Sequence, residues 1–178
     1  MPGMMRRRAF ALTLAVCTTA LALGTGLTAL ADPAVYDKLF FIQRSKNANE
    51  VHYDARVNGD GTLDGKEPVV GYWWNKAEDG SRKSISLIQR IAYGYDVDPG
   101  PNGTWVMKLK ALSDRPLTLL RVNGHWRAQV PIGGKPSYMN RIYVATDESG
   151  VFPKVLYVDV FGEEIGSGKP IQEHLVKN

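Results

Sequence analysis

The sequence predicts a mostly β protein of about eight antiparallel strands, arranged as a barrel or a two-layer sandwich with one short α-helix packed on it. Three observations lead to this fold class. Apolar and polar residues alternate with period two in several segments, as in strands that are buried on one face. Asn123-Gly124 lies between two apolar runs, which favours a two-residue hairpin turn. One segment, residues 84–95, has helical spacing instead.

The clearest strand is EVHYDARV, residues 50–57, in which the odd-numbered positions are apolar and the even-numbered positions are polar. Successive side chains of a strand point to opposite faces, so the apolar set is expected in the core. Similar patterns predict seven further strands, at KLFFIQR (38–44), VVGYWW (69–74), TWVMKLKAL (104–112), PLTLLRV (116–122), HWRAQVPI (125–132), NRIYVAT (140–146) and KVLYVDVFG (154–162).

The turn at Asn123-Gly124 also predicts a register. A type I′ turn needs positive φ at both central residues, which Asn and Gly tolerate. Such a turn places Val122 opposite His125 and Leu119 opposite Ala128. Directly opposed residues share a face, so the second pair is expected in the core.

The helix is predicted in SISLIQRIAYGY, residues 84–95, as two to three turns that end near Gly94. Ser84 is a candidate N-cap, because its hydroxyl can accept a hydrogen bond from the first turn. The apolar face that should pack on the sheet consists of Ile88, Ile91, Ala92 and Tyr95.

The strand VVGYWW is apolar on both faces and is therefore expected to be covered on both sides. Trp73 and Trp74 must point to opposite faces. We expect one indole under the helix and the other in the interior of the barrel or sandwich. The alternative is an indole that lines a cavity or is exposed for a ligand, which Gly71 would favour by allowing close approach.

The first 31 residues predict a cleaved signal peptide. MPGMMRRR is cationic, a long apolar run follows, and Ala29-Leu30-Ala31 resembles a cleavage site before Asp32. Residues 32–178 would then form a single β-rich domain that is secreted or periplasmic. A retained membrane anchor, twin-arginine export through RRAF and lipidation at Cys17 are the alternatives.

Signal removal would leave 147 residues with 19 basic and 18 acidic side chains and no cysteine. A balanced charge gives no reason to expect nucleic-acid binding, which needs a clustered basic surface. The mature chain would have no disulfide and no thiolate metal site. No transmembrane span is predicted after cleavage, and the sequence makes no prediction of oligomeric state.

The best catalytic candidates are Glu50, His52 and Asp54, which share one face of the predicted strand 50–57. Two carboxylates and an imidazole suit acid–base catalysis or a metal site. Residues two apart in a strand are separated by about 6.5–7 Å, which we expect to be too far for a hydrogen-bonded pair. The ordinary interpretation is the solvated face of a half-buried strand.

No other pattern predicts an enzyme. DGTLDG, residues 60–65, resembles the start of a calcium loop but has Gly71 where the last acidic ligand is expected, so a polar hairpin loop is favoured. The sequence contains no G-x-S-x-G, P-loop, G-x-G-x-x-G or C-x-x-C motif. We therefore predict no metal site and no cofactor, and leave enzymatic activity uncertain.

Aromatic residues suggest a binding function instead. Flat rings pack on apolar or carbohydrate ligands while their N–H or O–H groups remain free to hydrogen-bond. The hypothesis is a non-catalytic cell-envelope protein that binds an apolar, lipid-like or glycan ligand. The alternatives are a hydrolase or metal-dependent enzyme using the three polar residues of strand 50–57, and a structural or protein-interaction module. The candidate ligand-binding residues are Tyr72, Trp73, Trp74 and Trp126.

Four segments in order resemble the exported family described as domain of unknown function 4833. They are LFFIQRSKNANEVHYDA, EPVVGYWW, AYGY and KVLYVDVFGEEIGSGKPIQEHL. The resemblance covers nearly all of the predicted mature chain. It implies one compact domain in secreted or envelope-associated proteins, and it implies no established activity, substrate or cofactor.

Overall fold

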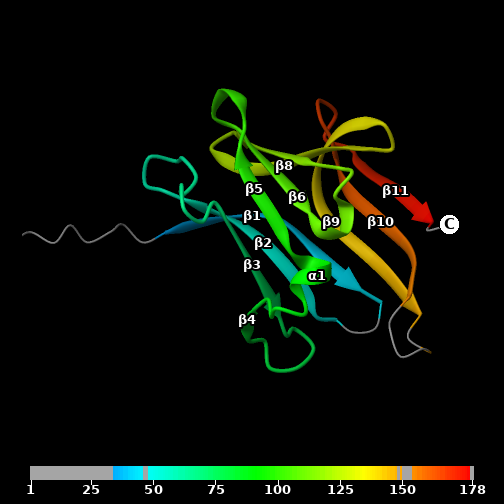
Figure 1. The fold of residues 1–178 in the computed structure, drawn as a ribbon. Helices are drawn as coiled ribbons and strands as arrows, with labels where there is room; N and C mark the ends of the chain where they lie inside the picture. Colours follow the sequence, from blue (N-terminus) through cyan, green and yellow to red (C-terminus); the bar gives the residue numbers. More distant parts are fainter. Residues whose placement is uncertain (1–33, 46–47, 148, 150–153, 177–178) are drawn as a thin grey trace, which may run out of the picture. The chain divides into compact units, whose positions relative to one another are not determined.

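A curled path of nine strands forms a half-barrel in the computed structural model, and two more strands branch from it (Figure 1). The structure describes residues 34–45, 48–147, 149 and 154–176. The predicted signal peptide lies outside them, so its cleavage stays a prediction. The strands are β1 (Val35–Arg44), β2 (Glu50–Val57), β3 (Val69–Trp74), β4 (Arg82–Ser84), β5 (Tyr95–Pro99), β6 (Trp105–Leu109), β7 (Leu117–Val122), β8 (His125–Ile132), β9 (Lys135–Asp147), β10 (Lys154–Glu164) and β11 (Pro170–Val176).

The strand order along the path is β4-β3-β2-β1-β9-β8-β7-β6-β5. β9 is the branch point, because β10 pairs along one edge while β8 and β1 share the other. All ladders are antiparallel except the short one between Phe41–Arg44 and Arg141–Val144, which is parallel. The predicted mostly β class with a short helix is confirmed, and the described residues form eleven strands rather than about eight.

The predicted hairpin is confirmed in detail. Asn123 and Gly124 have φ values of 51° and 89°, as a type I′ turn requires. Val122 pairs with His125, and Leu119 pairs with Ala128. Leu119 and Ala128 are fully buried, so the turn sets which side chains enter the core.

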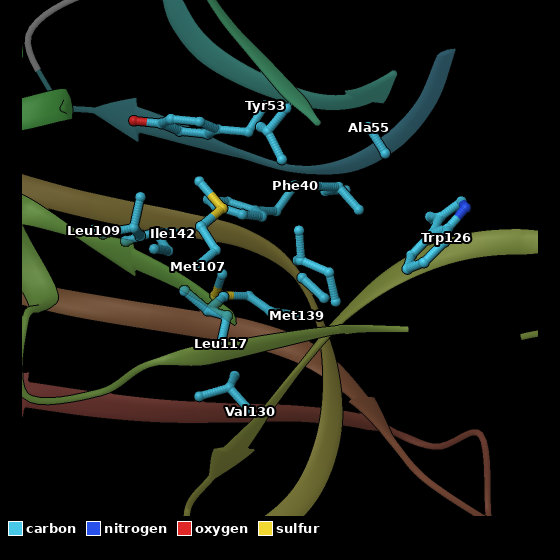
Figure 2. Packing of buried hydrophobic residues seen from close by; sticks show 14 of the residues in the cluster. Phe40, Tyr53, Ala55, Met107, Leu109, Leu117, Trp126, Val130, Met139 and Ile142 are labelled. Atoms are coloured by element: carbon cyan, nitrogen blue, oxygen red, sulfur yellow. The ribbon is translucent and has the colours of Figure 1, made fainter. Parts of the chain in front are cut away.

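The core lies inside the curl, between β1 and β2 on one side and the strands from β6 to β10 on the other (Figure 2). The apolar positions of β2 are buried as predicted, and the ring of Tyr53 stacks on that of Phe40. Met107 and Met139 occupy the centre, where flexible side chains can fill irregular gaps (Figure 2). Side chains from the concave face of the sheet thus fill the inside of the curl.

The helix is shorter than predicted. α1 (Arg90–Tyr93) is a single turn that ends at Gly94, as expected. The predicted N-cap was wrong, because Ser84 belongs to β4 and the N-cap is Gln89, whose side chain makes no capping bond. Ser86 stabilises the turn before the helix instead, since its Oγ accepts from the Gln89 N–H and its own N–H donates to Gln89 Oε1. Ile88 and Ile91 are exposed rather than packed on the sheet.

Two short 3₁₀ turns, η1 (Pro101–Gly103) and η2 (Lys110–Leu112), complete the described structure. α1 lies against η2 near the lower end of β5 (Figure 1). No helix within the described ranges is long and apolar enough to cross a membrane.

Candidate functional site

The polar side chains of β2 lie on the face of the sheet opposite the core. We call Glu50, His52, Asp54 and Tyr72 the outer-face cluster. The three β2 members are only 5–6% exposed, so the expectation of a solvated face was wrong. The reason is the register, which sets Phe41 and Tyr72 on either side of His52. Both rings stack on the imidazole, with centroids 5.2 and 5.4 Å away.

Glu50 and His52 form a hydrogen-bonded pair. Their Oε2 and Nε2 atoms are 2.8 Å apart, and the other Glu50 oxygen accepts from Lys76 Nζ at 3.0 Å. The expectation that residues two apart on a strand could not bond was therefore wrong. The separation of their Cα atoms does not limit two long side chains that lean toward each other along the strand.

The electrostatics favour an ionised Glu50. Burial opposes the charge, but the hydrogen bonds from His52 and Lys76 together outweigh it and lower the pKa of the carboxyl. An ionised carboxylate only accepts, so the His52 Nε2 carries the proton of this bond. Nδ1 bonds no residue that the structure describes. In the ring tautomer whose one proton is on Nε2, Nδ1 is the acceptor nitrogen and could take up a proton.

Asp54 has a different partner. Its Oδ2 accepts from the Tyr72 hydroxyl at 3.0 Å, while Oδ1 is buried and has no hydrogen bond. Burial, together with the charge and the hydrogen bond of Asp54, raises the pKa of Tyr72 to about 12. Throughout the described residues, no group of three or more His, Cys, Asp or Glu side chains is arranged to hold a metal ion.

The predicted aromatic residues lie in separate places. Trp73 points to the core side and packs edgewise on Tyr93 beside α1, as expected for one indole. The expectation that the other indole lies in the interior was wrong, because Trp74 lies on the outer face. Its ring is in an edge contact with His52, and its Nε1 donates to Gly80 O. Trp126 is buried, and its Nε1 donates to Gly61 O. The structure therefore brings Tyr72 and Trp74 together around His52, but not all four aromatic residues.

A cleft of about 560 Å³ lies where the two ends of the curled sheet face each other. One wall is the part of β3 that precedes its pairing with β4, and the other is the start of β5. The Tyr95 hydroxyl bridges these walls, because it donates to Val69 O and accepts from Gly71 N, both at 2.9 Å. One side chain thus hydrogen-bonds the edge of β3 that no strand pairs with at these residues.

The cleft combines an apolar floor with a charged rim. The lining includes Val69, Ile85 and the ring of Tyr95. Because Gly71 has no side chain, Ile85 and the Tyr95 ring can pack against its backbone. The rim carries five charged side chains, of which three are in ion pairs: Asp96 with Lys110, and Glu67 with Arg56 outside the rim. Lys66 and Arg90 make no ion pair with any described side chain.

Sequence reasoning did not find the cleft. Its lining comes from five separate stretches between residues 66 and 110, and none of them carries a recognisable motif. The one available signal was Gly71 in a strand, which indicates close approach of another group. That group is Tyr95 of β5, because a Cβ at residue 71 would lie 2.7 Å from the Tyr95 ring.

One family model matches the chain. It is described as Domain of unknown function (DUF4833), and it covers residues 40–174. The match extends from β1 to β11 and includes both the cleft and the outer-face cluster, and it confirms the resemblance found in the sequence. No curated protein and no solved structure matches the chain significantly. The chain belongs to the DUF4833 family.

Proposed function

We propose that this member of the DUF4833 family is an exported, non-catalytic binding protein whose ligand is an amphipathic anion held in the cleft between β3 and β5. The ligand has an apolar, lipid-like body and an acidic group. One observation carries the proposal: a cleft of about 560 Å³ with an apolar floor has two cations at its rim that pair with no described residue. Small-molecule sites typically measure about 300–1,000 Å³ and have few polar groups.

The chemistry of the rim selects the ligand class. Lys66 and Arg90 would pair with a carboxylate or phosphate, and charge-assisted hydrogen bonds of this kind are the strong ones. Ile85 and the Tyr95 ring offer the apolar body a surface from which water is displaced. A neutral glycan could stack on Tyr95 but would leave both cations without a partner. Export to the cell envelope rests on the cationic and apolar N-terminal segment.

The test is titration calorimetry with laurate, a twelve-carbon carboxylate. We expect saturable binding that weakens about tenfold in Lys66→Ala and in Arg90→Ala, because each removes a charged hydrogen-bond donor. Lys169→Ala is the matched control, since it removes an exposed lysine far along the sequence and outside the cleft lining. The proposal fails if laurate does not bind, or if both cleft variants bind it as well as the control does.

A second candidate is an enzyme that uses the outer-face cluster. The observation that favours it is the buried hydrogen bond between Glu50 and His52, which leaves Nδ1 as a general base. The reaction class would be hydrolysis assisted by proton abstraction from water. Asp54 would take part through Tyr72, whose hydroxyl it holds.

This candidate is tested by hydrolysis of p-nitrophenyl butyrate. Catalysis would require His52→Asn to lose about a hundredfold or more of the rate, as expected for a general base. Tyr72→Phe separates the roles, because it leaves the Glu50–His52 bond intact. A rate that does not change in His52→Asn excludes the cluster from the reaction.

A further inference from the structure

Three large aliphatic side chains project into solvent from α1 and the turn that leads into it. Leu87, Ile88 and Ile91 are 83%, 82% and 79% exposed, more than any other large apolar residue in the described part of the chain. They are contiguous on one short segment, whereas isolated exposed apolar residues are ordinary. The opposite side of this segment is anchored, because Tyr93 packs on Trp73. The segment is therefore held to the sheet by the side opposite these three side chains.

The charged side chains of this segment all have one sign. From Ser81 to Gly94 the chain contains Arg82, Lys83 and Arg90 and no acidic residue. All three cations are exposed, and none makes an ion pair with a described residue. The Arg82 guanidinium stacks on the Tyr72 ring, and the pKa of the nearby Asp79 carboxyl is lowered by hydrogen bonds from Ser81 and also by Lys83. An aliphatic tip with a basic collar is the composition of segments that lie in the interface of an anionic bilayer. Another protein would need a matching acidic and apolar surface, which a bilayer provides without further specificity.

We propose that Leu87, Ile88 and Ile91 insert into the interface of an anionic lipid bilayer, with Arg82, Lys83 and Arg90 on its head groups. We call these six residues the membrane tip. Arg90 and the neighbouring Ser84 and Ile85 also line the cleft, so docking would bring the mouth of the cleft to the lipid surface. The proposal does not depend on a ligand in the cleft. It would hold for a protein that binds membranes and nothing else.

The test is co-sedimentation with vesicles of phosphatidylcholine alone or with about one-third phosphatidylglycerol. It uses the chain from Asp32, because the apolar residues of the leader would themselves bind lipid. This chain retains the entire core, which spans residues 39–160. We expect binding to the anionic vesicles, weaker binding at high salt, and little binding to neutral vesicles.

Two variants separate insertion from electrostatics. We expect Leu87→Ser/Ile88→Ser/Ile91→Ser to weaken partitioning about tenfold or more, because it removes the apolar anchor. Arg82→Ala/Lys83→Ala should lose part of the affinity and part of its salt dependence. Leu156→Ser is the matched control, because it removes an exposed leucine from β10. The changed residues are exposed, and circular dichroism checks that each variant is folded.

The results distinguish a lipid bilayer from a second copy of the chain as the partner of the membrane tip. The proposal is overturned if the protein does not bind anionic vesicles, or if the triple serine variant binds them with the same affinity as the Leu156→Ser control. It is also overturned if the protein is a dimer in solution and the serine variant is a monomer, since the tip then contacts a second copy. Laurate binding in vesicle-free buffer tests the cleft separately, so failure of one proposal leaves the other measurable.

Discussion

At Glu50 a carboxylate is nearly covered by protein and still favours its charged form. Two donors, His52 and Lys76, stabilise the negative charge more than burial penalises it. The folded pKa therefore lies below the unfolded value of 4.5. A depressed pKa means that the stabilisation is complete above the unfolded value and is lost as pH falls through the folded one.

We predict that Glu50→Gln lowers the free energy of unfolding by about 1–3 kcal/mol at pH 7, because the amide is a weaker acceptor for two charged or polarised donors. The difference from wild type should shrink between about pH 5 and pH 3, as the wild-type carboxyl takes up its proton. Urea unfolding across this range measures it. Glu163→Gln is the control, since its pair with Arg127 is half exposed and should contribute less than about 1 kcal/mol. A difference that persists unchanged at pH 3 would contradict the assignment.

At Gly71 the packing of neighbouring side chains explains why the sequence has a glycine. Its φ is ordinary for any residue, so the requirement for glycine is steric rather than conformational. A Cβ there would lie 2.7 Å from the Tyr95 ring and 3.0 Å from Ile85. The ring cannot yield easily, because its hydroxyl holds two backbone groups of β3.

We predict that Gly71→Ala destabilises the protein by about 1–3 kcal/mol through overpacking. Gly65→Ala is matched to it, because nothing lies within 4 Å of a Cβ at that position and its φ is not positive. That control should change stability by less than about 1 kcal/mol. Thermal unfolding of the two variants side by side gives the comparison, and equal effects would show that the Tyr95 ring is free to move.

The local sequence pattern predicted the position of a side chain correctly where that position depends on one strand alone. The alternation in residues 50–57 assigned the two faces of β2 correctly. It could not assign the burial of the polar face, because Phe41 and Tyr72 come from other strands. For the same reason the bond between Glu50 and His52 was missed. The position of a side chain depends on which neighbours cover it, and the sequence alone does not state them.

At the scale of elements, the hairpin of β7 and β8 shows how strong a local signal can be. Two residues with positive φ specify the register of ten strand positions. The helix shows the reverse case. Ile88 and Ile91 have helical spacing, but spacing does not provide a surface to pack on, and the segment forms one turn with both side chains exposed.

We predict that Gly124→Ala lowers stability by about 1–2 kcal/mol, because an L-residue is strained at φ of 89°. The effect is purely conformational, since nothing lies within 4 Å of the added Cβ. Asn123→Gly keeps positive φ accessible at the other turn position and should change stability by less than about 1 kcal/mol. Chemical denaturation measures both variants. A larger loss in Asn123→Gly would contradict a turn stabilised by backbone conformation.

At the scale of the whole molecule, the path of the sheet could not be predicted. Period-two patterns indicate strands but do not say which strands pair, so neither the parallel ladder of β1 and β9 nor the branch at β9 followed from them. The cleft is a consequence of that path. It exists because the first part of β3, before its pairing with β4, faces β5 without a ladder between them, and its residues meet only in three dimensions.

The gap in the barrel is bridged by one side chain that acts in place of a strand. The Tyr95 hydroxyl gives the unpaired part of β3 one donor and one acceptor, as a neighbouring backbone would. We predict that Tyr95→Phe lowers stability by about 1–3 kcal/mol, because two backbone groups lose their partner. It should also accelerate hydrogen exchange at the Gly71 amide, which no longer has an acceptor.

The control for this prediction is Tyr53→Phe, which removes a hydroxyl that bonds the Tyr93 carbonyl and not β3. Both variants should be destabilised, but only Tyr95→Phe should expose the Gly71 amide. Hydrogen–deuterium exchange resolved by residue separates them, because it reports local opening rather than total stability. Equal protection of Gly71 in the two variants would mean that β3 is held by its pairing with β2 alone. The bonds of the Tyr95 hydroxyl would then contribute little to holding the two ends of the sheet together.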